Sequence, residues 1–453
     1  MENHDANTVS TVRAGRDIVY TNKLDPFYGT VLSNPQRLAV SGPGRFEVLA
    51  GRNIDLGGSN GILSRGNLDV ANLPAAGADL YVMAGLGQDA NGRARLPDYQ
   101  TFASHYFDGS ATGRQALQDF FANVERQLRL NQALSEADVQ QQIADYRGKF
   151  DGMALPEKAL LVFFSELRQG GVQGSAGHYQ RGYQAIASLF PAQDYQGNIN
   201  LFNSQIKTES EGDINLLAPG GLINVGLAKP GNTKSPSDQG IFTASGGVIR
   251  SFSKGDFLVN QSRVFTLQGD DLLLWSTTGN IDAGKGSKTA SATPPPRLIF
   301  KDGAIGLDTT SIVSGSGIGQ LLARAGYKAG EVDLIAPAGD VNAGEAGIRV
   351  AGDLLIAAQH VIGSDNIQVG GVSVGVPAAQ GTSLTGLSGS GLGAGRPEDA
   401  TKGLDPNKNE EALKRMKQAL SGLQASFISV DVVGFGPTGQ SSGLSEEEKR
   451  KQR

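Results

Sequence analysis

The sequence predicts a β-helix, a solenoid in which each coil lays its short strands on those of the coil before it. The first observation is a recurring phrase of glycine, a polar residue and alternating apolar positions. Its copies begin at Gly51, Gly66, Gly197, Gly212, Gly279, Gly330 and Gly352. The second is a content of 63 glycines in 453 residues, which indicates many tight corners. The third is an aromatic share of only 6%, which a thin interior of small and branched side chains tolerates.

Each copy of the phrase is typical of a turn followed by a short strand. In Gly212 to Leu216 (GDINL), alternation places the apolar residues on one face of the strand and the polar residues on the other. One such strand cannot bury its apolar face alone, but a stack of strands can. The spacing between glycines is irregular, which favours corner loops of variable length over a propeller or a leucine-rich array.

Charge and cysteine content exclude several classes of function. The net charge of -5 gives the chain no general attraction to nucleic acid or anionic lipid. The chain contains no cysteine, which excludes disulfides, thiolate metal sites and cysteine nucleophiles. A chain without cysteine is also compatible with export in an unfolded state, because no premature disulfide can block passage.

The start of the chain lacks the features of a secretion signal. Met1 to Asn7 has neither a basic start nor an apolar run. No stretch of eighteen apolar residues is present to span a membrane. The alternating pattern begins almost at once, at Gly15, without a recognisable cap. We therefore expect the sequence to be a C-terminal piece of a longer exported protein.

The first coils are expected over residues 1–96, and residues 97–192 predict a helical module inserted between two coils. From Gln115 to Arg147, apolar residues fall at helical spacing with almost no glycine. Ser135 to Asp138 is a capping box that opens the second helix of this stretch. Two further helices are expected, from Pro156 to Arg168, ended by Gly170 and Gly171, and from Tyr179 to Leu189, stopped by Pro191. Because the module holds much of the aromatic content, it is expected to form its own small core.

The strand pattern resumes after the module, and β-helix coils are expected over residues 193–377. Within them, Thr293 to Arg297 contains three prolines and is expected to be a rigid surface crossing. Residues 378–404 indicate a flexible Gly/Ser linker. Residues 405–435 predict a helix and a strand that fold back to cap the last coil, with a membrane-surface helix as the alternative. Residues 436–453 predict a disordered tail.

The sequence yields no catalytic, cofactor-binding or metal-binding residue, and we predict no cofactor. The histidines at positions 4, 105, 178 and 360 are far apart, and none has a metal-ligand spacing. Gly315-Ser316-Gly317 lies in a glycine-serine run without the context of a nucleophile elbow, so corner flexibility is the favoured interpretation. Trp275, the only tryptophan, is expected in the core. Its alternatives are stacking on a sugar ring or on the helical module.

The acidic residues of the repeat allow two functional interpretations and a structural one. The residues concerned are Asp213, Asp256, Asp270, Asp271, Asp282 and Asp340. They could line a cleft, as in β-helix enzymes that cut acidic polysaccharides, or bind calcium. The structural interpretation, turns and hydrogen-bonded side-chain ladders, is favoured because these residues occur about once per unit along the chain.

Several long strings resemble one protein family. They are residues 212–225 (GDINLLAPGGLINV), residues 255–283, the Pro-rich crossing with residues 297–303, residues 330–344 (GEVDLIAPAGDVNAG) and residues 427–434. They resemble the C-terminal region of filamentous-haemagglutinin-type exoproteins, which Gram-negative bacteria export by two-partner secretion. The resemblance covers about residues 10–435. It implies a right-handed parallel β-helix, secretion across the outer membrane and a part in adhesion. Some relatives are held at the cell surface by a terminal cysteine pair, which this chain lacks.

The resemblance and the residues together predict a non-enzymatic structural and interaction segment of a large secreted filamentous adhesin. Its expected place is the cell exterior, secreted or surface-bound. Its expected partners are an outer-membrane transporter of the two-partner type during export and a host receptor or polysaccharide, with no nucleic acid and no membrane span. Because insertions in solenoids project from the shaft, the helical module is the favoured partner-binding element.

Two other functions remain open. One is a carbohydrate-active enzyme on the same scaffold, a polysaccharide lyase or hydrolase. Two or three acids with an Arg or Lys in one groove would favour it, and acids spread along corners would count against it. The other is a C-terminal toxin or processing region, although the segment after residue 405 is too short for an independent enzyme.

Overall fold

The computed structural model describes most of the chain up to residue 377. The described residues are 1–20, 23–24, 31–32, 36–67, 72–174, 178–228, 234, 238–286, 297–301, 304–308, 315–321 and 326–377. All of them lie in the first of the chain's two units, Met1–Gln380. The predicted linker, C-terminal helix and strand, and tail lie outside the described residues, as do residues 293–296 of the Pro-rich crossing.

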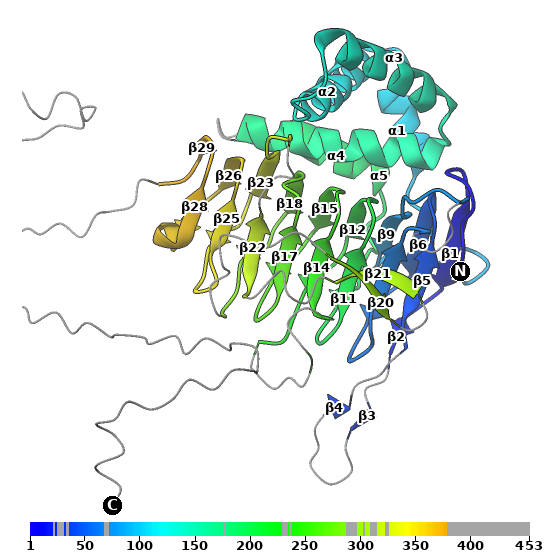
Figure 1. Cartoon of the computed structure of the whole chain (residues 1–453), viewed down its shortest axis with the longest axis vertical. Helices are drawn as coiled ribbons and strands as arrows, with labels where there is room; N and C mark the ends of the chain where they lie inside the picture. Colours follow the sequence, from blue (N-terminus) through cyan, green and yellow to red (C-terminus); the bar gives the residue numbers. More distant parts are fainter. Residues whose placement is uncertain are drawn as a thin grey trace, which may run out of the picture. The chain divides into compact units, whose positions relative to one another are not determined.

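Three parallel sheets form a β-helix, which confirms the predicted fold class (Figure 1). Sheet I has nine strands: β1(Val9–Ala14), β6(Arg45–Ala50), β9(Asp79–Met83), β12(Ile214–Ala218), β15(Ile249–Ser253), β18(Leu272–Ser276), β23(Glu331–Ala336), β26(Asp353–Ala358) and β29(Ser373–Val374). Sheet II has eight: β2(Ile18–Val19), β7(Ile54–Asp55), β10(Ile199–Asn200), β13(Ile223–Asn224), β16(Phe257–Leu258), β19(Ile281–Asp282), β24(Val341–Asn342) and β27(Val361–Ile362). Sheet III has eight: β5(Leu38–Ser41), β8(Ile62–Arg65), β11(Gln205–Thr208), β14(Gly240–Thr243), β17(Arg263–Thr266), β22(Gly317–Gln320), β25(Ile348–Val350) and β28(Ile367–Val369).

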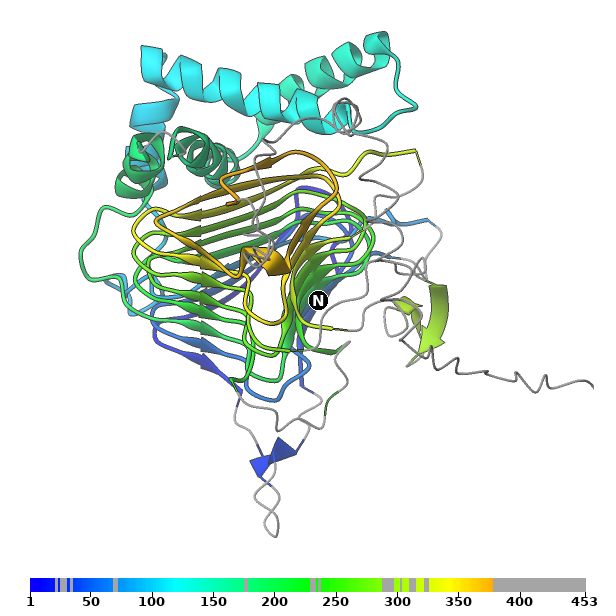
Figure 2. The ribbon, with the colours of Figure 1, turned by 90° about the vertical axis from the view of Figure 1, so that its left-hand side faces the viewer.

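Each coil contributes one strand to each sheet in turn, and the coils stack one behind another (Figure 2). We call the three sheets with their corners the shaft. Two antiparallel pairs are additions to it: β3(Lys23–Leu24) with β4(Val31–Leu32), and β20(Arg297–Lys301) with β21(Ala304–Asp308). A short 3-10 helix, η2(Ser364–Asn366), precedes β28.

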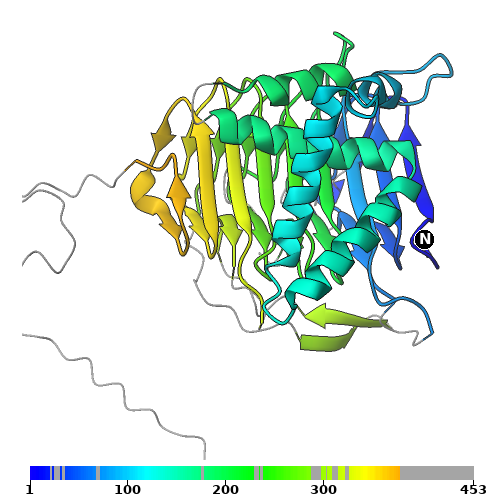
Figure 3. The same cartoon turned by 90° about the horizontal axis from the view of Figure 1, so that it is seen from above.

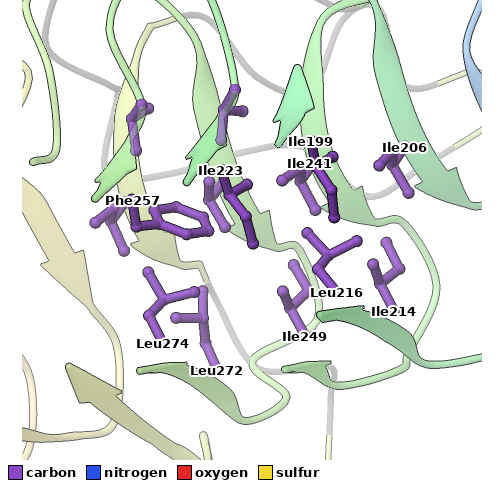
Figure 4. Packing of buried hydrophobic residues seen from close by; sticks show 14 of the residues in the cluster. Ile199, Ile206, Ile214, Leu216, Ile223, Ile241, Ile249, Phe257, Leu272 and Leu274 are labelled. Carbon is purple, nitrogen blue, oxygen red and sulfur yellow. The ribbon is translucent and has the colours of Figure 1, made fainter. Parts of the chain in front are cut away.

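The interior of the shaft is filled by apolar residues that align from coil to coil. In sheet II, Ile199 pairs with Ile54 on one side and Ile223 on the other. Apolar side chains from the three sheets point toward one another in the interior (Figure 4). A row of this kind gives every inward residue a partner in the next coil, so that short strands suffice.

A helical module, α1 to α5, interrupts one coil between β9 and β10. Its helices are α1(Tyr99–Tyr106), α2(Ala111–Leu128), α3(Glu136–Gly152), α4(Leu155–Gly174) and α5(Gln180–Leu189). The module lies over the outer face of sheet I, with α4 crossing its strands (Figure 3). The predicted capping box is confirmed: Ser135 Oγ accepts from the Asp138 N–H at 3.2 Å, and Asp138 Oδ2 accepts from the Ser135 N–H at 3.0 Å.

Three features of the module differ from the sequence prediction. Helix α1 is an additional helix, and α4 continues through Gly170 and Gly171 to Gly174. At Gly171 an added Cβ would lie 2.2 Å from Ile335 Cδ1, so this glycine marks a close approach to sheet I and not a helix end. The described aromatic side chains of the module do not form the separate core that the sequence predicts, because they share one cluster with outward-facing residues of the shaft.

Candidate functional site

The outer face of sheet I carries an apolar column that seats the helical module. The column is Leu49, Met83, Leu217, Phe252, Trp275, Ile335 and Ala357, aligned by the parallel register. All seven are buried, although they point away from the shaft interior. These strands are therefore covered on both faces, which is why they contain runs such as Leu272-Leu273-Leu274-Trp275 instead of strict alternation.

Trp275 lies at the centre of this contact. Its side chain is fully buried, and its ring makes edge contacts with Tyr179 and Tyr183 at centroid distances of 6.2 and 6.1 Å. Its Nε1–H donates to Thr277 Oγ1 at 3.1 Å. Gly182 of α5 lies so close that an added Cβ would be 2.3 Å from Trp275 Cη2. Trp275 is buried, as expected of a core residue, but it points away from the shaft interior and packs against the helical module, which the sequence analysis gave as an alternative.

Helix α4 matches the spacing of the strands beneath it. Glu157 near its start pairs with Arg45 of β6 at 3.5 Å, Phe163 contacts Phe252 of β15, and Gly171 meets β23. The fourteen residue steps from Glu157 to Gly171 rise about 21 Å at 1.5 Å per residue. The five strand spacings from β6 to β23 cover about 24 Å at about 4.8 Å each. Each turn of α4 therefore lies over roughly one strand.

The acidic residues at the corners bind the backbone of the next coil. Asp79 Oδ1 accepts the Asp213 N–H at 2.8 Å, and Asp213 Oδ1 accepts the Val248 N–H at 2.8 Å. Other bonds of this kind, written acceptor to N–H, are Asp271 to Glu331, Asp353 to Val372, Asn53 to Asn198, Asp256 to Asn280 and Asn280 to Asp340. Asp282 forms a turn by accepting the Gly284 N–H at 2.6 Å. Of the acids singled out in the sequence, Asp213, Asp256 and Asp271 are thus confirmed as ladder residues, and Asp282 is confirmed as a turn residue.

Some of the same carboxylates also hold the module to the shaft. Arg126 of α2 pairs with Asp271 and, at 3.6 Å, with Glu331. Arg168 of α4 pairs with Glu331 and, at 3.0 Å, with Asp333. Burial raises the pKa of the Asp333 carboxyl, and the neighbouring Arg168 opposes that rise. Arg126 thus ties α2 to two successive coils, and Arg168 ties α4 to the second of them.

A groove lies between the module and the corner where sheet III leads into sheet I. Its volume is 330 Å³, and its walls come from α2, α3 and the α2–α3 connection on one side and from residues near Asp270 and Tyr327 on the other. The connection pairs with the shaft directly, because the Lys328 N–H donates to the Leu130 carbonyl at 2.8 Å. A smaller cavity of 50 Å³ shares Tyr146 and Asp271 with the groove. Of the acids singled out in the sequence, Asp270 and Asp271 line these cavities.

A second group of charges lies farther along the same face. Arg250 donates to Asp213 Oδ2 at 2.7 Å and to Asn215 Oδ1 at 3.2 Å. Burial, reinforced by the charge of Asp213, raises the pKa of Asp79 to about 7. Burial likewise raises the pKa of Tyr146 to about 12. Near neutral pH, Asp79 is therefore partly protonated beside Asp213, which is held by an arginine.

The other residues considered in the sequence lie away from the groove. His360 contacts Asp340 at 2.8 Å on the surface, and His105 bonds the Thr101 carbonyl on α1. In the described part of the chain, no three His, Asp or Glu side chains form a group able to hold a metal ion. Ser316 lies in a corner before β22, between two glycines with positive φ, which agrees with corner flexibility.

The described residues define a solenoid protein of the parallel β-helix class with a helical module docked on one sheet. Residues 269–378, from the shaft side of the groove through β29, match the model of a family described as filamentous haemagglutinin family outer membrane protein. The match confirms the resemblance seen in the sequence. No curated protein and no solved structure showed a significant match to the chain. Among the described helices, none is long and apolar enough to cross a membrane.

Proposed function

We propose that the chain is a non-enzymatic structural and interaction segment of a large secreted filamentous adhesin. In this proposal the segment reaches the cell exterior through an outer-membrane transporter of the two-partner type and supports attachment to host surfaces, matrix polysaccharide or other cells. The family match over residues 269–378 and the β-helical shaft support this role.

The observation that carries the proposal is the use of acidic residues along the shaft. Asp213 and Asp271 each accept a backbone N–H of the next coil, and each pairs with an arginine. A carboxylate with both oxygens engaged in this way is poorly placed to act as a general acid or base. These polar groups hold the coils and the module together, so that they stabilise an extended surface. Attachment to another surface requires such a surface.

The test is binding of the purified chain to host cells and to bacterial exopolysaccharide. Release of reducing sugars and absorbance of unsaturated products are followed in the same wells. Saturable binding without product supports the adhesin segment. Absence of binding to every surface contradicts it.

The raised pKa of Asp79 is the observation that favours a carbohydrate-active enzyme as the second candidate. Two neighbouring carboxyls, one of them with a raised pKa, are the arrangement that glycosidases use for acid and base. Against it, neither Asp79 nor Asp213 lines the groove or the smaller cavity described above. Product release that survives repurification and is lost in Asp79→Asn would support this candidate over the first.

A further inference from the structure

We propose that the groove between α2, α3 and sheet I binds a neutral oligosaccharide, with one sugar hydroxyl reaching Ser165 through the adjoining cavity. The inference rests on the proposed function, because it names the class of ligand that one part of the adhesin surface takes. It assigns this role to the face where the module meets the shaft, whereas the sequence suggested only that the module projects and binds.

The size and lining of the groove suit a sugar. Its 330 Å³ lies in the range of small-ligand pockets. Amide side chains lie on both of its walls, Gln127 and Gln142 from the module and Gln268 from the shaft. An amide both donates and accepts hydrogen bonds, as a sugar hydroxyl does. Tyr146 adds an aromatic ring to the lining, and the C–H surface of a sugar packs well on such rings.

An unpartnered hydroxyl points to a ligand independently of the groove. Ser165 of α4 is 6% exposed, and its Oγ has no hydrogen-bond partner. It lines the 50 Å³ cavity, which shares Tyr146 and Asp271 with the groove. Buried hydroxyls normally have a partner, and this space is large enough for a water molecule or one ligand hydroxyl. A sugar held in the groove can therefore place one hydroxyl in the smaller cavity, where it forms the missing hydrogen bond with Ser165 Oγ.

The charges around the cavities select a neutral ligand over a polyanion. The two arginines that line the smaller cavity are both engaged, Arg168 by carboxylates of β23 and Arg250 by Asp213. A uronate or sulfate group would have to displace a carboxylate from one of them, and Asp271 would repel it. Among the described residues, the groove itself, in contrast to the smaller cavity, is lined by one cationic residue, Lys328, and this residue is exposed. A neutral hexose chain meets no such penalty.

The experiment measures binding of three hexasaccharides to the full chain by calorimetry and ligand-observed NMR. The probes are maltohexaose and chitohexaose, which are neutral, and hexagalacturonate, which is acidic. We expect at least one neutral hexamer to bind at least tenfold more tightly than hexagalacturonate. Ser165→Ala should weaken that binding by about three- to tenfold, and Gln142→Ala, on the exposed side of α3, should weaken it as well.

Ser251→Ala is the matched control. Ser251 Oγ is also buried without a partner, but its strand position turns it into the shaft interior. Both serine variants should fold, because each removes an unsatisfied hydroxyl, and Ser251→Ala should bind like the parent chain. The inference is overturned if no neutral hexamer binds at millimolar concentration, if hexagalacturonate binds as tightly, or if Ser165→Ala and Gln142→Ala bind like the parent, which would leave water as the partner of Ser165. Cell-surface binding that persists while hexamer binding is absent overturns this inference alone and leaves the proposed function standing.

Discussion

The contact between Gly182 and Trp275 allows the docking of the helical module to be tested by adding one methyl group. In Gly182→Ala the new Cβ would lie 2.3, 2.8 and 3.0 Å from three carbons of the Trp275 ring. The ring cannot move aside easily, because it is fully buried and enclosed by Tyr179 and Tyr183. Overpacking of this kind costs about 1–3 kcal/mol. Alanine gains at most about 1 kcal/mol over glycine in a helix, and subtracting that gain leaves a net loss of about 0–2 kcal/mol.

Gly148 provides a control of the same chemistry without the contact. It lies in α3, is exposed, and has no atom within 4 Å of an added Cβ. Gly148→Ala should therefore stabilise the protein by about 0.5–1 kcal/mol. Urea unfolding is followed by far-ultraviolet circular dichroism and by the fluorescence of Trp275, the only tryptophan in the chain. If the two variants shift the midpoint in the same direction and by similar amounts, the close approach of α5 to Trp275 is wrong.

Three further outcomes are expected. Because the raised pKa of Asp79 makes the native state hold a proton that the unfolded chain releases above about pH 4, the free energy of unfolding should fall between about pH 4 and 7. Asp79→Asn should remove much of this fall and be the more stable protein at pH 8 in thermal melts, by about 1.4 kcal/mol per unit of raised pKa, and an equal slope in both proteins would contradict the assignment. Leu216→Ala, deep in the shaft, should lower the free energy of unfolding by about 2–5 kcal/mol in urea titrations. A loss below about 1 kcal/mol would argue against the close packing of apolar side chains in the shaft interior. Asn280→Ala, which removes one exposed rung of the ladder to Asp340, should cost only about 0.5–1.5 kcal/mol in the same assay, and a cost equal to that of Leu216→Ala would refute the distinction between core and corner.

Features that depend on neighbours in the sequence were predictable, and features that depend on distant contacts were not. The glycine-polar-apolar phrase predicted the sheets because each coil must place apolar side chains in the shaft interior. This holds whether or not another element covers the outer face of its strands. The capping box at Ser135 was predictable because both of its bonds close within three residues. Gly170 and Gly171 were misread as a helix end, since their role is to let α4 approach α5 and Ile335.

The groove lay beyond sequence reasoning for the same reason. Arg126 meets Asp271 at a separation of 145 residues, and Arg168 meets Asp333 at 165. No local pattern relates such pairs. One signal was present: the run from Leu272 to Trp275 is apolar at outward as well as inward positions, which indicates a strand covered on both faces.

The docked module changes how this solenoid is held together. In an ordinary solenoid each repeat contacts only its neighbours, so stability is close to a sum of local terms. Here α4 begins by pairing with Arg45 of β6 and reaches Ile335 of β23, which joins coils on both sides of the module's own insertion point. The family match at residues 269–378 includes Trp275 and Ile335 but none of the helices that cover them. Those residues alone would expose an apolar column, so the module and the matched region are one structural unit.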